Sequence, residues 1–480
     1  MKNLRLLSSI ILLAGFVLLL QSCGTSKSEQ DNSAAAGLTP YHKDSVIFSL
    51  SLISNINEGR FGSVDSLQEQ ATRGVTNLLH NDSVQQLIGT WTPVWGPVTY
   101  TEDPTGNKNP DTCVTDNTMM LLKGTDPSNP SKTLYVLAIA GTIGASSYDW
   151  FTEDFGLDTM ALWPAKTPGE SNTGAFKQPS TSYDSGVTNT GRYISNGLAT
   201  GLNVLFNTME DGSKGTLMNY LSTTFKNSSN SIEIAVAGHS LGGALAPCVA
   251  LSLMDNQSAW NPELSCNITC YATAGFSPGN KPFATYFNQQ LGANFQGSCN
   301  SNDLAIHLYE TSTMLQVPTL YDSVIGNCSY LQNQSFINGF IDCFSGKIAP
   351  FGYTSIYPPS TAFTKSIAYN CDSLSNDYNG AITAYNNPTS SDFLLLLAFN
   401  QSAEKFGLNH SDSLFARTVC FGEMTLQQHV NAYVNHFGIG LLQQIYSRQL
   451  APSISNPSSI NTSMLNGAKK NSIMSSCLVL

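Results

Sequence analysis

The chain has 480 residues, a formal net charge of −11 and only 11% charged residues. Hydrophobic residues make up 41% and aromatic residues 10%, which is enough to bury a large core and excludes an intrinsically disordered chain. Because the net charge is negative and no segment concentrates lysine and arginine, we expect no nucleic acid among the partners.

The N-terminal end of the chain predicts export from the cytosol. Lys2 and Arg5 precede an apolar run over residues 6–20, which is short for a membrane-spanning helix. The run ends in LQSC, which resembles the signal of bacterial lipoproteins, in which the cysteine becomes the acylated first residue. The resemblance implies a signal peptide over residues 1–22 and lipid attachment at Cys23. It implies a protein of the bacterial cell envelope, anchored to a membrane and facing the periplasm or the exterior; an uncleaved membrane anchor is the alternative.

The segment that follows predicts a linker and the start of a folded domain. Residues 23–40 are small and polar, which is typical of a flexible tether. We expect the domain itself to span residues 41–450. Apolar spacing typical of helices occurs over residues 41–80, 190–207 and 214–226.

Five apolar segments predict strands, at residues 90–100, 118–123, 133–140, 232–237 and 268–272. The helical pattern GGALAPCVALSLM stands between the last two. Strand, helix and strand in this order predict an α/β fold with a largely parallel central sheet and flanking helices.

Two G-x-S-x-G motifs, around Ser240 and Ser277, are candidates for a nucleophile elbow. Such an elbow places a serine on a sharp turn between strand and helix, and the N–H of the next residue donates to the oxyanion. Ser240 follows an apolar strand, precedes a helix, and is followed by Leu241, which has an N–H to donate. Ser277 is followed by Pro278, which has none, and no helical pattern begins there. We therefore expect Ser240 to be the nucleophile.

The sequence VAGHSLGGALA around Ser240 resembles the class 3 (fungal-type) lipase family, and the resemblance spans residues 85–440. It implies an α/β-hydrolase fold and a carboxylic ester hydrolase of the lipase or esterase type. The implied partner is an ester or lipid substrate, and no metal or organic cofactor is called for. Residues 275–288 resemble the block after the next strand in this family, which explains the second motif without catalysis.

Residues 138–154 resemble the strand and loop that supply the oxyanion hole in this family. The resemblance implies the backbone N–H groups of Thr142 and Leu241 as the oxyanion donors. Ala140 stands where the family often has arginine. The apolar segment over residues 144–186 is where a lipase would bear its lid.

A serine nucleophile needs an imidazole to take its proton and a carboxylate to orient that imidazole. In α/β-hydrolases the chain order is serine, acid, histidine. His429 lies in LQQHVNAY, which resembles the family's C-terminal histidine with a tyrosine soon after, and we favour it over His410 and His436. For the acid we favour Asp303, in a segment similar to the family's Asn-x-x-Asp block, over Asp322 or another acid in the long segment between residues 304 and 428.

The cysteines beyond the tether indicate one or two disulfides in an exported protein, with the pairing left open. Residues 322–348, which include Cys328 and Cys343, are expected to form an insertion that covers the site or tightens it with a disulfide. The Ser/Asn-rich residues 451–480 predict a polar, peripheral C-terminal tail.

The expected function is hydrolysis of carboxylic esters, with lipids as the substrate class, through an acyl-enzyme on Ser240. The alternative is a non-catalytic envelope lipoprotein that uses a degenerate hydrolase fold for binding. The departures at Ala140, Pro247 and the segment around Asp303 favour that alternative. A peptidase on the same fold has no distinguishing feature in the sequence.

Overall fold

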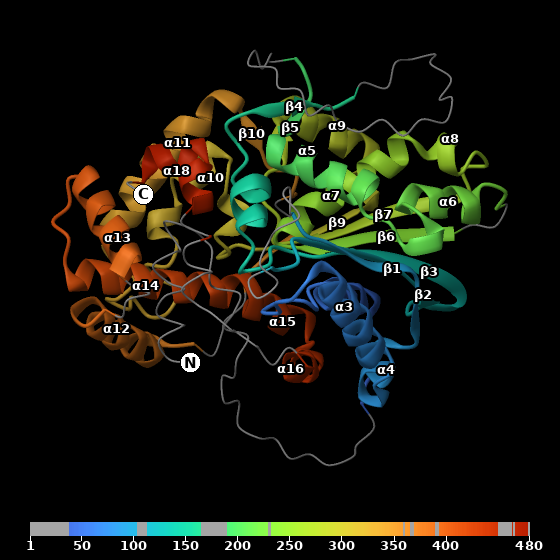
Figure 1. Ribbon diagram of the computed structural model, residues 1–480, viewed down its shortest axis with the longest axis horizontal. Coiled ribbons are helices and arrows are strands. Elements are labelled where there is room, and N and C mark those ends of the chain that lie inside the picture. Colours follow the sequence, from blue (N-terminus) through green and yellow to red (C-terminus); the bar gives the residue numbers. More distant parts are fainter. Residues whose placement is uncertain are drawn as a thin grey trace.

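The central sheet of the described part of the protein begins with three successive strands, and its later strands are separated along the chain by helices (Figure 1). The computed structural model describes residues 38–102, 113–164, 190–228, 232–358, 361–364, 369–388, 393–449, 463 and 466–478. The signal peptide predicted over residues 1–22, the attachment site at Cys23 and most of the predicted tether lie outside these residues. No helix among the described residues is long and apolar enough to cross a membrane.

The central sheet is seven-stranded and has the order β1-β2-β3-β6-β7-β9-β11. From β3 to β11 every neighbouring pair is parallel, whereas β1 and β2 join through antiparallel pairs. This confirms the predicted α/β fold with a largely parallel sheet. The strands are β1 (Trp91–Tyr100), β2 (Asn117–Asp126), β3 (Asn129–Ile139), β6 (Ile232–His239), β7 (Cys266–Thr273), β9 (Phe295–Asn300) and β11 (Ala362–Phe363).

Both faces of the sheet are buried, because successive residues of a strand point to opposite faces. In β3, Val136 and Ala138 pack with one helical layer, while Leu137 and Ile139 pack with the other. The first layer comprises α2 (Lys43–Ile53), α3 (Val64–Leu79), α4 (Asp82–Ile88) and α16 (Gly440–Gln449). The second comprises α5 (Asn196–Asn203), α6 (Leu217–Phe225), α7 (Leu241–Asp255), α8 (Gln257–Trp260) and α9 (Lys281–Leu291).

A small antiparallel sheet of four short strands accompanies the second layer (Figure 1). Its order is β10-β8-β5-β4, with antiparallel pairing throughout. The strands are β4 (Met160–Leu162), β5 (Tyr193–Ser195), β8 (Gly279–Asn280) and β10 (Tyr353–Thr354).

Beyond β9 the chain forms a helical region beside the sheet, at the left of Figure 1, which we call the helical flank. It includes α10 (Thr311–Met314), α11 (Ser335–Ile348), α12 (Cys371–Asn386), α13 (Phe393–Lys405), α14 (Asp412–Leu426) and α18 (Ser472–Cys477). The expected insertion at residues 322–348 lies here, and α11 is its helical part. Its two cysteines form separate disulfides, Cys328 with Cys371 and Cys343 with Cys477.

The end of the chain is not peripheral, in contrast to the prediction for residues 451–480. Ile473, Met474 and Cys477 are buried in α18, and the disulfide fixes this helix to α11. The segment is polar in composition, but its few apolar residues lie on one face of α18 and are buried there. Composition alone therefore did not predict this burial. Most of the remaining tail lies outside the described residues.

Candidate active site

Ser240 occupies the turn between β6 and α7 with φ 60° and ψ −127°, a conformation that residues with a side chain rarely adopt. Glycines permit the turn, because a Cβ on Gly238 would lie 2.1 Å from the carbonyl oxygen of Gly242. A Cβ on Gly242 would lie 2.7 Å from the carbonyl oxygen of Ala140, just after β3. The turn is thus a strained strand-to-helix elbow that brings the end of β3 close to the serine.

Hydrogen bonds join Ser240 to the predicted histidine and acid. Oγ of Ser240 lies 2.9 Å from Nε2 of His429, and Nδ1 of His429 lies 2.9 and 3.0 Å from the two carboxylate oxygens of Asp303. Asp303 is 0% exposed and His429 is 6% exposed. When Nδ1–H donates to the carboxylate, Nε2 is left free to accept the serine proton, which is the tautomer that a general base requires.

The structure brings neither rival histidine to the serine. His410 lies on the helical flank, with Nε2 3.5 Å from a carboxylate oxygen of Glu404. The ring of His436 stacks on Phe363 with centroids 3.7 Å apart. Asp322, the rival acid, makes no hydrogen bond to a histidine within the described ranges.

Ser277, the serine of the second motif, is buried after β7. Its Oγ has no hydrogen-bond partner among the described residues, so no imidazole activates it there. This agrees with the expectation that the second motif is not a nucleophile elbow.

The segments that carry the histidine and the acid are fastened to each other by Asn300. His429 lies in a π-helical turn, η10 (Gln427–Asn431), which continues α14. Nδ2 of Asn300 donates to the backbone oxygen of Gln428 at 2.9 Å and to its side-chain oxygen at 2.8 Å. Asn300 also accepts the backbone N–H of Asp303 at 2.9 Å. Asn300 could not be predicted from the sequence, because its role depends on β9 and η10 meeting in space.

Tyr433, in α15 (Ala432–Phe437), completes the surroundings of the buried acid. Its hydroxyl donates to Oδ2 of Asp303 at 2.9 Å and accepts the backbone N–H of Asn300 at 2.8 Å. Burial first, and then the charge of Asp303, raises the pKa of Tyr433 well above its ordinary value, so the hydroxyl stays protonated. Tyr433 could have been identified from the sequence, because it follows His429 by four residues and therefore lies on the same helical face.

His239, the residue before the serine, packs against the imidazole. Its ring centroid lies 4.9 Å from that of His429, and its Nδ1 lies 2.9 Å from Oγ1 of Thr273. Burial, and secondarily the nearby His429, lowers the pKa of His239 well below its ordinary value. His239 is therefore a neutral packing residue.

The two predicted oxyanion donors lie on either side of the elbow. Leu241 is the first residue of α7, where backbone N–H groups have no intrahelical acceptor. Thr142 follows Gly141, on which a Cβ would lie 3.2 Å from Cβ of Ser240. Oγ1 of Thr142 donates to Oδ2 of Asp154 at 2.9 Å, and burial raises the pKa of Asp154 to about 8.

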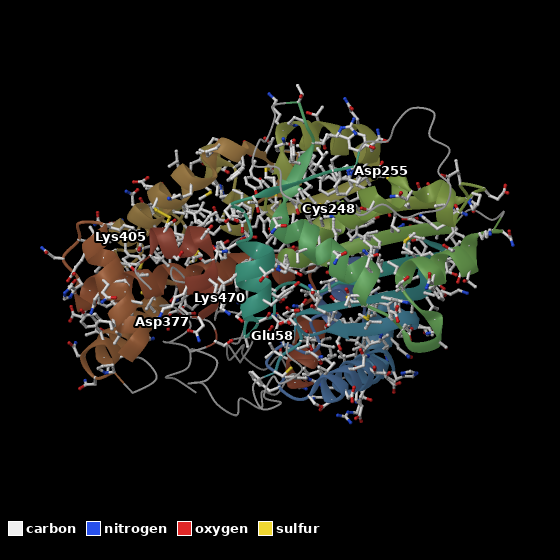
Figure 2. The ribbon with its side chains drawn as sticks, turned by 45° about the horizontal axis from the view of Figure 1, so that its top comes forward. Glu58, Cys248, Asp255, Asp377, Lys405 and Lys470 are labelled. Carbon is white, nitrogen blue, oxygen red and sulfur yellow. A yellow bond between two sulfur atoms is a disulfide. The ribbon has the colours of Figure 1, made fainter. Side chains whose placement is uncertain are left out.

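Buried carboxyl groups hold the backbone that follows Thr142. Asp149 accepts the N–H of Ile143 at 2.7 Å, and Glu58 accepts the N–H of Gly144 at 3.2 Å. Glu58 is buried, and this raises its pKa to about 7; the residue is labelled below the centre of Figure 2. Burial and the charge of Asp116 raise the pKa of Asp149. These acids form no group that could hold a metal ion within the described part of the chain.

An apolar cavity is lined by two residues that directly follow Asp154 and Asp303 in the sequence. Its free volume is about 30 Å³, enough for one water molecule. These two residues are Phe155 and Leu304, and α11 supplies four of the ten lining residues. The lining residues are Phe155, Leu304, Leu308, Val317, Ile337, Phe340, Ile341, Phe344, Phe421 and Met474.

Comparisons with known proteins agree with this fold. Residues 168–312 match the family model described as lipase (class 3). No curated protein gives a significant match to the chain. The solved structure of M37 lipase is similar over 87% of this chain and 98% of its own, with 19% identity and a TM-score of 0.56, a likeness that shows the fold.

Two further solved structures align less well. A triacylglycerol lipase whose catalytic centre is a serine-protease triad covers 55% of this chain and 73% of its own, with 15% identity and a TM-score of 0.30. Lipase II from Rhizopus niveus covers 53% and 78%, with 17% identity and a TM-score of 0.29. With TM-scores this low, these two structures give no information about the fold of this chain. The chain therefore has an α/β-hydrolase fold, and its residues 168–312 are similar in sequence to the class 3 lipases.

Proposed function

We propose that the protein is a serine hydrolase that cleaves carboxylic esters of lipids through an acyl-enzyme on Ser240. The observation that carries the proposal is the hydrogen-bonded series from Ser240 through His429 to buried Asp303, with the serine on a strained elbow. The similarity of residues 168–312 to the class 3 lipases supports lipid esters as the substrate class.

In the first half-reaction His429 Nε2 takes the proton of Ser240 as Oγ attacks the ester carbonyl. The imidazolium is stabilised by Asp303, and it then gives the proton to the alcohol oxygen as the C–O bond breaks. In the second half-reaction His429 takes a proton from water, which attacks the acyl-enzyme. The products are the alcohol and the carboxylic acid, and the serine regains its proton.

The tetrahedral intermediates carry negative charge on the former carbonyl oxygen. We assign its stabilisation to the backbone N–H groups of Thr142 and Leu241, which flank the elbow. Removing one oxyanion donor costs about 10²–10³-fold in kcat in other acyl-transfer enzymes.

We propose the apolar cavity as the binding site for the acyl chain of the ester. Phe155 and Leu304, which line the cavity, directly follow Asp154 and Asp303. The free volume of about 30 Å³ is too small for an acyl chain, so the α11 wall has to move outward when the chain enters.

We also propose that the protein is exported and attached to an envelope membrane through acylated Cys23. The support is the basic and apolar N-terminal sequence that ends in LQSC. Metabolic labelling with a fatty acid should acylate the wild type and not Cys23→Ser. Equal labelling of the two proteins would contradict this attachment.

The proposed activity is tested with the full chain purified in detergent and p-nitrophenyl esters of short and long acyl chains. Ser240→Ala and His429→Ala should each lower kcat by roughly 10⁴–10⁶-fold. The matched controls are Ser277→Ala, the serine of the other motif, and His436→Ala, and both should stay active.

Ester hydrolysis that persists in Ser240→Ala would contradict the assignment of Ser240 as the nucleophile. A folded wild type that hydrolyses no ester and does not react with a fluorophosphonate would favour the non-catalytic binding protein instead.

A further inference from the structure

The last described residues of the chain, 466–478, lie across the segment that follows the proposed oxyanion donor. A Cβ on Gly467 would lie 2.5 Å from the ring of Phe151, so the backbone of Gly467 packs directly against this side chain. Ala468, Ile473 and Met474 are each 3% exposed or less. We call residues 466–478 the C-terminal clamp.

Asn471 makes the polar contacts between the clamp and this segment. Its Nδ2 donates to the backbone oxygen of Phe151 at 3.0 Å and to that of Phe155 at 2.7 Å. Its Oδ1 accepts the N–H of Met474 at 3.0 Å, which caps the N-terminus of α18. One amide side chain therefore starts the last helix and fastens it to the neighbouring segment.

The two carbonyl groups that Asn471 binds flank Asp154. Phe151 is the third residue of η2 (Asp149–Asp154) and Phe155 directly follows η2, so both carbonyls are among the last of the helix, which lack intrahelical partners. Asp154 in turn accepts the hydroxyl of Thr142, the proposed oxyanion residue, at 2.9 Å. Asn471 is thus two contacts away from the oxyanion hole.

Covalent and polar contacts hold the clamp in place from its other side. Cys477 is bonded to Cys343 of α11, 134 residues away in the sequence. Nζ of Lys405 donates to the backbone oxygen of Ser476, and Figure 2 shows Lys405 at the helical-flank side of the molecule. The clamp therefore links η2 to α11 and α13.

We propose that Asn471 is a positioning residue for the oxyanion hole and that the Cys343–Cys477 disulfide keeps it in place. The inference rests on the proposed function. Without the two donated hydrogen bonds the end of η2 loosens, and Asp154 holds Thr142 less firmly. Transition-state stabilisation then falls while binding of a short ester changes little, because the oxyanion forms only after attack.

The test uses Asn471→Ser in the full chain. Serine caps a helix N-terminus about as well as asparagine, yet its shorter side chain does not reach the two carbonyl groups. The matched control is Asn370→Ser, the same change at the N-cap of α12. We expect kcat per active site, counted by fluorophosphonate titration, to fall about tenfold for Asn471→Ser with KM unchanged, and to stay unchanged for the control.

A second pair of variants tests the covalent link. Replacing Cys343 and Cys477 by alanine together should lower kcat in the same way. Replacing Cys328 and Cys371, which form the other disulfide of the helical flank, should leave kcat unchanged.

Hydrogen exchange gives a readout that does not need activity. In Asn471→Ser the amides of residues 149–158 should exchange faster than in the wild type and in Asn370→Ser. Unchanged exchange there, or an unchanged kcat in an active enzyme, overturns the inference. A wild type without esterase activity would instead contradict the proposed function, so the two failures are distinguishable.

Discussion

At the residue scale, the acid of the candidate site depends most on its surroundings, because an ionised carboxylate buried away from water needs several hydrogen-bond donors. Asp303 receives the hydroxyl of Tyr433 at 2.9 Å, the N–H of Ala305 at 2.9 Å and Nδ1–H of His429. Together these donors hold the carboxylate that has to stabilise the imidazolium.

Tyr433→Phe removes one of these donors and leaves the ring packing intact. We expect kcat to fall about tenfold, equivalent to about 1–1.5 kcal/mol, with KM for a short ester unchanged. Tyr286→Phe is the matched control, because Tyr286 also donates to an aspartate, Asp255, at 2.6 Å. Figure 2 shows Asp255 far from Glu58, on the other side of the molecule. Equal losses in both variants would contradict a specific role for Tyr433.

The buried acids make stability depend on pH in a direction that is opposite to that of salt-bridged carboxylates. Burial raises the pKa of Glu58 to about 7 from an ordinary value of 4.5, so the folded state retains the proton longer than the unfolded state. The resulting stabilisation is fully present below about pH 4.5 and is lost as pH rises to about 7. Its upper bound is about 3 kcal/mol.

Glu58→Gln should therefore flatten the pH dependence of stability. Glutamine keeps an oxygen for the N–H of Gly144 and cannot ionise. Urea unfolding at pH 5 and pH 8 should show a smaller difference in unfolding free energy for the variant than for the wild type, by about 1–2 kcal/mol. The same pH dependence in both proteins would contradict an ionisation of Glu58 in this range.

At the scale of elements, the elbow depends on β3, β6 and α7 approaching without intervening side chains. A Cβ on Gly242 would lie 2.4 Å from the carbonyl oxygen of Ile139 and 2.7 Å from that of Ala140, so neither backbone has room for it. Gly242→Ala should destabilise the fold by about 1–3 kcal/mol and lower kcat. Gly346→Ala is the control, because nothing lies within 4 Å of its Cβ in α11 and alanine favours a helix. Unfolding midpoints that move equally for both would refute the close approach.

Helix α11 forms the outer wall of the apolar cavity, and its side chains should set the length of acyl chain that fits. Phe340 lines the cavity, whereas Phe336 on the same helix stacks on Phe399 instead. Phe340→Ala should raise kcat/KM for long-chain relative to short-chain esters, and Phe336→Ala should not. An unchanged chain-length ratio in Phe340→Ala would place the acyl chain elsewhere.

At the scale of the whole molecule, five strands of the central sheet (β1, β2, β3, β6 and β7) were predictable because each is an apolar run beside polar turns. Strands β9 and β11 were not predicted, because β9 is mostly polar and β11 has only two residues. The segment around Ser240 was equally informative, since an elbow needs small residues and a free N–H within a few positions. The buried end of the chain was not, because its few apolar residues are separated by serines and its cysteine pairs with a distant helix. The contacts of Asn300 depend on β9 and η10 meeting in space, which no local pattern encodes, whereas Tyr433 was indicated only by its spacing from His429.

The most direct test of Ser240 as an activated nucleophile is mass spectrometry of the full chain after reaction with a fluorophosphonate. One adduct per chain is expected, mapped to the peptide that contains Ser240, with none in His429→Ala within the time that labels the wild type fully. No adduct on the folded wild type, or an adduct on Ser277 or another serine, would contradict the proposed mechanism.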